Sequence, residues 1–178
     1  MTYLHFGGRC LLALVFAASA AAKLRSPGAF RAFRRGLAAM RVLPDRAVPL
    51  VAVLVAGLEA VVPAALLVKG AELPGLAVAV LLLTAFTVAI ALTLRRGTTA
   101  VCPCFGVSGS PFGPRHLARN SALLTVGAFT AVATRTGGLP PPPGLVLTGV
   151  AAAVLAVLAI TFDDLADVML GPVRKGAR

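Results

Sequence analysis

The sequence predicts an all-α protein: a polytopic membrane helical bundle of four or five transmembrane helices with one short interfacial amphipathic helix. The first observation is composition. Of the 178 residues, 58% are hydrophobic and 13% are charged, and the mean hydropathy is +0.93. Soluble domains carry about 45–50% apolar and about 25% charged residues. The second observation is order along the chain, because long apolar runs alternate with short segments that hold most of the positive charges.

Five apolar segments have the length of a membrane-spanning helix, or nearly so. They cover residues 4–22, 47–68, 73–94, 117–136 and 145–162. The first contains Arg9 and also imitates a secretory signal peptide, although the positive charges that follow favour a retained helix. The fourth is the weakest because Arg119 and Arg135 stand near its rims. It either spans the bilayer with both arginine stems reaching the interface, or dips in and returns.

The connection between the first two segments, residues 23–46, predicts the amphipathic helix. It holds seven Lys or Arg residues and one acid. Four apolar residues recur in it at steps of three and four, with arginines between them. These are Phe30, Phe33, Leu37 and Met40. Such a helix lies in the plane of the lipid headgroups. The whole chain, residues 1–178, then forms a single membrane domain without repeats.

The distribution of positive charge predicts which side of the membrane each loop faces. With five spans, fourteen Lys or Arg residues fall on one side and three on the other. Loops rich in these residues stay in the cytoplasm. The N-terminus is therefore expected outside, and the segment between the third and fourth spans inside. The net charge of +11 does not indicate nucleic-acid binding, because the chain has no Trp, one Tyr and no basic patch interleaved with aromatics. The predicted partner is the lipid bilayer.

The segment between the third and fourth spans contains the sequence CPC, with Cys102 and Cys104 on either side of Pro103. A disulfide between such close cysteines is strained and easily reduced, and it closes almost no loop. Arg95 and Arg115 lie nearby, and positive charge favours the reactive thiolate. The pair therefore indicates a reversible dithiol centre.

Two other interpretations of the pair stay open: two idle thiols, or a metal site. Zinc is disfavoured because the segment offers only His116 as a third ligand and no carboxylate as a fourth. Cuprous ion, which prefers thiolates, is the better metal candidate. The prediction assigns no metal. Cys10 is expected to be a small packed hydrophobic residue.

Charged residues inside apolar spans are candidates for a functional or pairing role. Glu59 lies about 18 Å from the cytoplasmic end of the second span, and Arg9 lies about 21 Å from the cytoplasmic end of the first. Depth therefore pairs Arg9 with Glu59, as an interhelical ion pair or as part of a proton or ligand site. Lys23 is expected to reach out to the headgroups.

Several motifs resemble the MauE family of membrane proteins, which is related to the DoxX-like group. They are "SAAAKLRSPGAF" after the first span, "AGLEAVVPA" in the second, "CPCFG" after the third and "ARN" opening the fourth. The resemblance runs over residues 9–120 and more loosely beyond. It implies a helical bundle associated with thiol redox chemistry. It also implies a thioredoxin-like partner and a part in maturing methylamine dehydrogenase, a disulfide-rich enzyme.

Carried onto this chain, the resemblance makes Cys102 and Cys104 the redox pair. The supporting polar residues are Lys23, Glu59, Arg119 and Asn120. The bundle also looks like vitamin K epoxide reductase, which leaves a quinone open as cofactor. This chain, however, has C-x-C in place of C-x-x-C and no second cysteine pair. The resemblance favours cysteines outside the cell, whereas the charge count favours the cytoplasm. The alternative function is a non-enzymatic scaffold or a copper-binding, transport-associated component.

Overall fold

The structure, a computed structural model, describes residues 1–97, 113–134 and 140–170, and every regular element in those ranges is a helix. The six helices are α1 (Thr2–Leu24), α2 (Pro27–Ala39), α3 (Val48–Leu67), α4 (Glu72–Arg95), α5 (Pro114–Ala133) and α6 (Pro142–Leu170). Cys102 and Cys104 lie outside the described residues.

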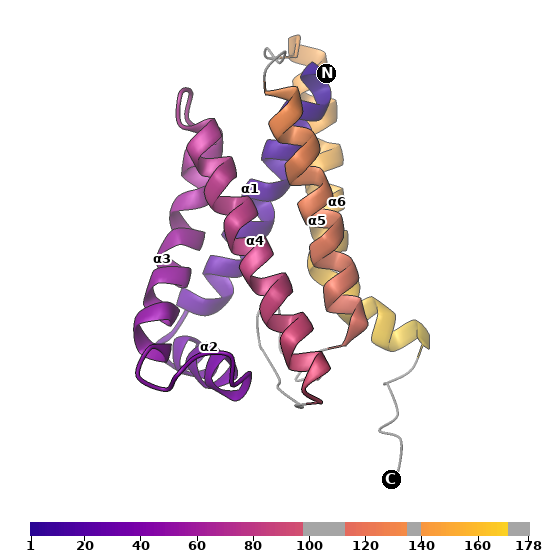
Figure 1. The fold of residues 1–178 in the computed structure, drawn as a ribbon. Helices are drawn as coiled ribbons and strands as arrows, with labels where there is room; N and C mark the ends of the chain where they lie inside the picture. Colours follow the sequence, from indigo (N-terminus) through magenta and orange to yellow (C-terminus); the bar gives the residue numbers. More distant parts are fainter. Residues whose placement is uncertain (98–112, 135–139, 171–178) are drawn as a thin grey trace.

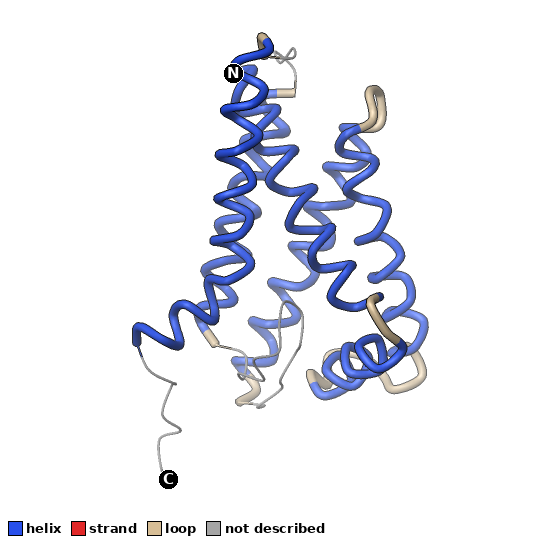
Figure 2. Tube along the Cα trace, turned by 180° about the vertical axis from the view of Figure 1, so that it is seen from behind, coloured by secondary structure: helices blue, strands red, loops and turns tan. Residues whose placement is uncertain are grey.

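Five helices run up and down the bundle, and α2 lies across its lower end (Figures 1 and 2). Four are long and apolar enough to cross a membrane: α1, α3, α4 and the Pro142–Phe162 part of α6. The fifth, α5, runs beside them and packs against α4 and α1. The predicted all-α membrane bundle is confirmed.

The centre of the bundle is α1, which contacts α2, α3, α5 and α6. Its Leu12 is fully buried and its Phe16 nearly so, in a cluster that also takes side chains from α3, α4, α5 and α6. By contrast, α6 leaves Leu147, Val154 and Leu158 exposed. Exposed aliphatic side chains suit a helix that faces lipid, because lipid tails are as apolar as leucine.

Sequence signals account for α2. Ser26 precedes the helix and its Oγ accepts a hydrogen bond from the Ala29 N–H at 3.1 Å, which caps the helix. Phe33 and Leu37 are buried against α3 and α4, in a cluster that includes Ile90. The predicted amphipathic helix is confirmed, with its apolar face turned towards the other helices.

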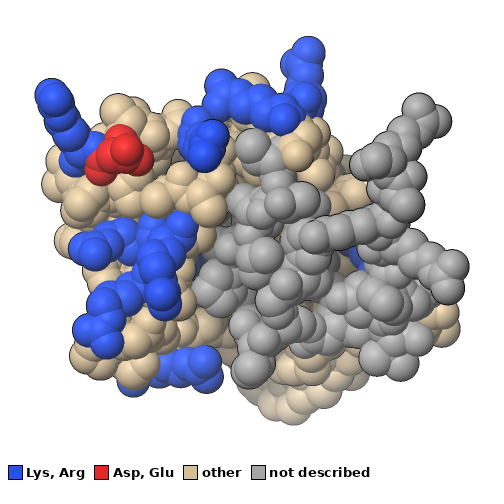
Figure 3. All heavy atoms as spheres, turned by 90° about the horizontal axis from the view of Figure 1, so that it is seen from below, with Lys and Arg blue, Asp and Glu red and all other residues tan. Residues whose placement is uncertain are grey.

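Positive side chains gather at the lower end of the bundle, where α1 and α4 end, α3 and α5 begin, and α2 lies (Figures 1 and 3). Eight exposed arginines belong to this end: Arg25, Arg31, Arg34, Arg35, Arg41, Arg46, Arg95 and Arg96. Among the described side chains of this end, only Asp45 is an exposed acid. The charge asymmetry read from the sequence is thus concentrated on one face of the fold.

Candidate functional site

A buried hydrogen-bonded triad links α1 to α3. Lys23 Nζ donates to Glu59 Oε2 at 2.6 Å and to Ser19 Oγ at 2.6 Å, and Ser19 Oγ donates to the same carboxylate oxygen at 3.2 Å. Ser19 and Lys23 are four residues apart on α1, so they share one face of that helix. The side chains of Lys23 and Glu59 are 1% and 2% exposed, so the ion pair is shielded from both water and lipid.

Two aromatic rings complete the surroundings of the Lys23 ammonium. Its Nζ lies 4.9 Å from the ring centroid of Phe33 on α2 and 5.8 Å from that of Phe86 on α4. The face of an aromatic ring carries negative charge that attracts a cation, most strongly where water is excluded. Four helices therefore contribute to holding one ammonium group: α1, α2, α3 and α4.

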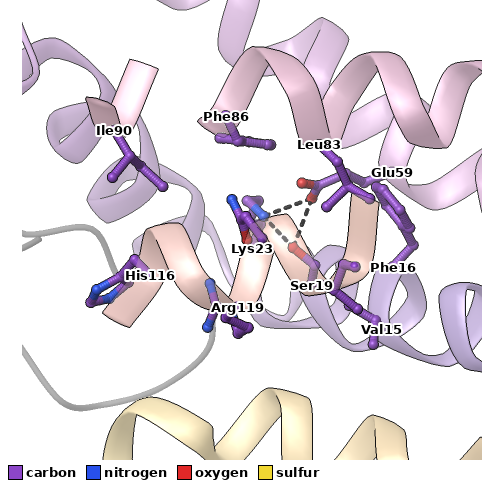
Figure 4. Close-up of a pocket in the computed structure, with 12 residues that line it drawn as sticks. Val15, Phe16, Ser19, Lys23, Glu59, Leu83, Phe86, Ile90, His116 and Arg119 are labelled. Carbon is purple, nitrogen blue, oxygen red and sulfur yellow. Dashed lines mark hydrogen bonds and ion pairs between the residues drawn. The ribbon is translucent and has the colours of Figure 1, made fainter. Parts of the chain in front are cut away.

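The triad forms one wall of a pocket whose other wall is α5 (Figure 4). Three polar residues of α5 line it: His116, Arg119 and Asn120. Arg119 and Asn120 are 8% and 5% exposed. His116 Nδ1 accepts a hydrogen bond from the Gly113 N–H at 3.3 Å, which fixes the start of α5. Across the pocket, the carboxylate and hydroxyl of the triad face the imidazole, guanidinium and amide of α5. The remaining lining is apolar.

The size of the pocket limits what it can hold. Its volume is about 40 Å³, which is enough for water or one small polar group. Ordinary small-molecule sites have volumes of roughly 300–1,000 Å³. The described residues thus enclose much less space than an ordinary small-molecule site does. The chemistry available there is proton transfer and charge stabilisation through Lys23, Glu59 and Ser19.

The predicted pairing of Arg9 with Glu59 is wrong. Arg9 instead lies at the opposite end of α1, where its Nη1 is 3.3 Å from Glu72 Oε1 and its Nε donates to the Leu66 carbonyl at 2.6 Å. The same Nη1 is 3.2 Å from His5 Nε2. Arg9 therefore belongs to a separate cluster that fastens α1 to the turn between α3 and α4.

The error comes from assuming that α1 and α3 end at the same level. Fourteen residues separate Arg9 from Lys23, and thirteen separate Glu59 from Glu72, so both ion pairs fit one antiparallel register. In this register α1 ends one residue after Lys23, whereas α3 continues for eleven residues from Glu59 back to Val48. At 1.5 Å per residue, α3 extends about 15 Å beyond α1. The space below α1 is filled by α2.

The expectation that Lys23 reaches the headgroups is wrong for the same reason. Because α2 packs across the end of α1, Phe33 covers the lysine and the ammonium turns inward to Glu59. Four of the five polar residues singled out from the sequence line one pocket, and Arg9 lies elsewhere. The four are Lys23, Glu59, Arg119 and Asn120.

Sequence reasoning did not include Ser19 in the site. A signal was present, because Ser19 stands one helical turn before Lys23 in an otherwise apolar stretch. His116 was considered only as a metal ligand. Within the described part of the chain, no group of three or more His, Cys, Asp or Glu side chains is placed to hold a metal ion. Cys10 is a free thiol, half-buried against the central apolar cluster.

Two comparisons with known proteins bear on the family to which the chain belongs. Residues 1–134 match the family model described as methylamine utilisation protein MauE. A curated relative, methylamine utilization protein MauE of Paracoccus denitrificans, is 39% identical over 98 residues, which is 54% of this chain and 51% of the relative. The chain thus spans about half the length of that relative. No solved structure matches the chain. Because the family model covers about three quarters of the sequence, the chain belongs to the MauE family.

Proposed function

We propose that this chain is a membrane-embedded thiol–disulfide redox protein in which Cys102 and Cys104 exchange electrons with a thioredoxin-like partner. The exchange assists disulfide formation in, or maturation of, a partner protein. The names of the family and of its Paracoccus denitrificans relative connect them with methylamine utilisation, and we propose that this chain serves the same process.

The positions of the two helices that flank the cysteine segment support the proposal. The segment leaves α4 after Gly97 and enters α5 at Gly113, at the lower end of the bundle. Both flanking helices line the pocket, through Ile90 and His116. Cys102 follows Gly97 by five residues, so the length of the chain keeps it within about 18 Å of that glycine. Tethering at both ends supports the proposal that the thiols act near the pocket that holds Lys23 and Glu59.

The charge at the ends of the segment favours the chemistry. Arg95 and Arg96 close α4, and Arg115 and Arg119 stand in the first two turns of α5. Cations and a helix N-terminus both lower the pKa of a nearby thiol, which favours the thiolate. The thiolate, not the thiol, attacks a disulfide.

The proposed reaction conserves two electrons and two protons. One thiolate of the pair attacks a disulfide sulfur of the partner and forms a mixed disulfide, and a partner thiolate leaves. The second thiol of the pair loses its proton and attacks the mixed disulfide, which releases the reduced partner and leaves Cys102 and Cys104 oxidised. The reverse sequence reduces the pair again. We propose that Lys23 and Glu59 take up or supply a proton close to this exchange.

We further propose that the cysteine segment faces the cytoplasm and the N-terminus faces outside. The grouping of the exposed arginines at the lower end supports this orientation. They flank α1, α3 and α4 on the same side, as positively charged loops do in the cytoplasm.

A trapping experiment tests the redox proposal. Cys102→Ser and Cys104→Ser, each in a Cys10→Ala background, leave one thiol that can form a mixed disulfide but cannot resolve it. Membranes are alkylated and run on non-reducing gels, and adducts are identified by mass spectrometry. We expect at least one variant to hold a thioredoxin-like protein that the variant without both cysteines does not hold.

If neither variant traps a partner, the redox proposal fails. Copper that co-purifies with the parent protein and is lost from both serine variants would instead identify a copper-binding component.

A further inference from the structure

Apart from the pocket, the lower half of the bundle has an apolar groove between α3 and α4, called here the α3–α4 groove. Its volume is about 440 Å³. Its lining is apolar except for Thr84, whose hydroxyl donates to the Val80 carbonyl at 2.8 Å within α4. Residues that define it include Leu37, Val42, Val51, Val55, Val88 and Leu92. Leu81 and Val88 at its rim are 65% and 51% exposed, so the groove opens on the side of the bundle.

Two arginines stand where the groove reaches the end of the membrane helices. Arg96 lies four residues after Leu92, so the face of α4 that lines the groove continues to this guanidinium. Arg41 immediately precedes Val42, another lining residue. Arg96 Nη1 donates to the Arg41 carbonyl at 2.8 Å, which joins the segment after α2 to the end of α4.

The backbone at this point fixes where the Arg41 carbonyl lies. Arg41 directly follows Met40, the C-cap of α2, and has φ +52°, the left-handed conformation that commonly ends a helix. Its N–H donates to the Ala38 carbonyl at 3.1 Å, and its own carbonyl accepts from Arg96. At the end of α4, Gly97 has φ +65° and stops the helix, so that Arg96 is the C-cap residue of α4.

We propose that the α3–α4 groove is a binding site for one anionic phospholipid, with an acyl chain in the groove and the phosphate on Arg41 and Arg96. The apolar lining matches a hydrocarbon chain, and the two guanidinium groups match a phosphodiester, which arginine binds through paired hydrogen bonds. Clusters of basic residues at the end of membrane helices attract anionic headgroups. Among the described side chains of this end, eight exposed arginines and one exposed acid provide that field.

The site also touches the pocket. Phe86 lines both the groove and the pocket, and its ring lies 5.8 Å from Lys23 Nζ. An acyl chain in the groove would pack against the same ring that shields the buried lysine. The inference does not depend on the redox proposal, because it uses no cysteine.

Native mass spectrometry of the purified protein tests the proposal. The protein is incubated with equal amounts of phosphatidylglycerol and phosphatidylcholine that carry identical acyl chains. We expect one retained phosphatidylglycerol, preferred about tenfold over phosphatidylcholine, and we expect Arg41→Gln/Arg96→Gln to abolish the preference. The matched control is Arg31→Gln/Arg34→Gln, which removes the same charge from exposed positions of α2 and should keep the preference.

Two further variants separate binding from folding. Arg41→Gln alone keeps the hydrogen bond from Arg96 to the Arg41 carbonyl, so it should fold normally and still weaken retention. Ala85→Leu fills the groove from an exposed position, leaves both arginines in place and should also weaken retention. Equal retention of both lipids by the parent protein would overturn the proposal. So would equal loss in both double variants, full retention by Ala85→Leu, or a dimer that covers the groove in place of lipid.

Discussion

Glu59 Oε2 lies 2.6 Å from Lys23 Nζ, and the two side chains join helices that are consecutive spans of the bundle. Each has further partners: Ser19 touches both, and Phe33 and Phe86 face the ammonium. A buried ion pair is expensive to desolvate, and the cost is offset only when geometry is good and extra hydrogen bonds are present. Both conditions hold here. Removing one member should therefore lower the stability of the protein strongly, and removing both should lower it weakly.

Replacing Glu59 by Gln is expected to destabilise the protein by about 3–5 kcal/mol, because it leaves the Lys23 ammonium buried without a counter-charge. Lys23→Met should cost a similar amount by leaving the carboxylate. The double variant Lys23→Met/Glu59→Gln removes both charges and should recover most of the loss. The measurement is thermal unfolding and the yield of monodisperse protein in detergent.

Additive losses in that cycle would show that the two side chains do not interact. A different result has its own meaning: if Glu59→Gln folds with unchanged yield but loses thiol exchange, the carboxylate serves the chemistry more than the fold.

The second ion pair, between Arg9 and Glu72, should behave asymmetrically. The Glu72 side chain is 24% exposed, so solvent screens the pair and Glu72→Gln should change the stability only slightly. The Arg9 side chain is 10% exposed and also holds the Leu66 carbonyl at 2.6 Å, so Arg9→Gln should cost more, by about 1–3 kcal/mol. Unfolding temperatures in one detergent would rank the two variants, and the reverse ranking would contradict the arrangement described for this end.

Two glycines of the membrane helices should differ sharply when replaced by alanine. A Cβ on Gly75 of α4 would meet the carbonyl carbon of Ala65 at 3.0 Å and the backbone nitrogen of Leu66 at 3.1 Å. Backbone atoms cannot turn aside, so Gly75→Ala should destabilise the contact of α3 with α4 by about 1–3 kcal/mol. Gly57→Ala on α3 meets nothing within 4 Å and should be neutral or stabilising by up to about 1 kcal/mol. Matching unfolding curves for the two variants would refute this close approach.

Labelling with a membrane-impermeant maleimide should place Cys102 and Cys104 on the cytoplasmic side. In a Cys10→Ala background, we expect labelling in inverted vesicles after reduction and none in intact cells. This follows from the positive charges around the segment. Labelling of intact cells after reduction would reverse the orientation, and full labelling without reductant would leave idle thiols or a labile metal site as the better account.

Much of the fold was predictable because lipid imposes simple demands on sequence. Residues 73–94 coincide closely with α4. An uninterrupted apolar run in a bilayer forms a helix because a helix satisfies its own backbone hydrogen bonds. The alternation of Phe33 and Leu37 with Arg34 and Arg35 likewise predicted α2. Periodicity does not indicate which helices the apolar face of α2 packs against.

That missing information explains the error at the site. From sequence, the depth of Glu59 is counted from the end of the second span and that of Arg9 from the end of the first. Only the packed structure shows that the lower end of α3 lies about 15 Å beyond the lower end of α1, with α2 filling the space between them. Relative register of two helices depends on long-range contacts, such as Lys23 with Glu59, that leave no periodic signal in a single sequence. Residue types were therefore predictable at this site, and their partners were not.

The separation of the ion pair along the chain bears on how the protein enters the membrane. Lys23 precedes Glu59 by 36 residues, so during synthesis the first helix and its lysine are made before the acidic span. A lone acidic side chain at mid-bilayer costs about 3 kcal/mol. When α3 arrives, the ammonium that neutralises its glutamate already exists on α1. A hairpin of α1 and α3 that is closed by this ion pair therefore carries Glu59 with its charge already neutralised.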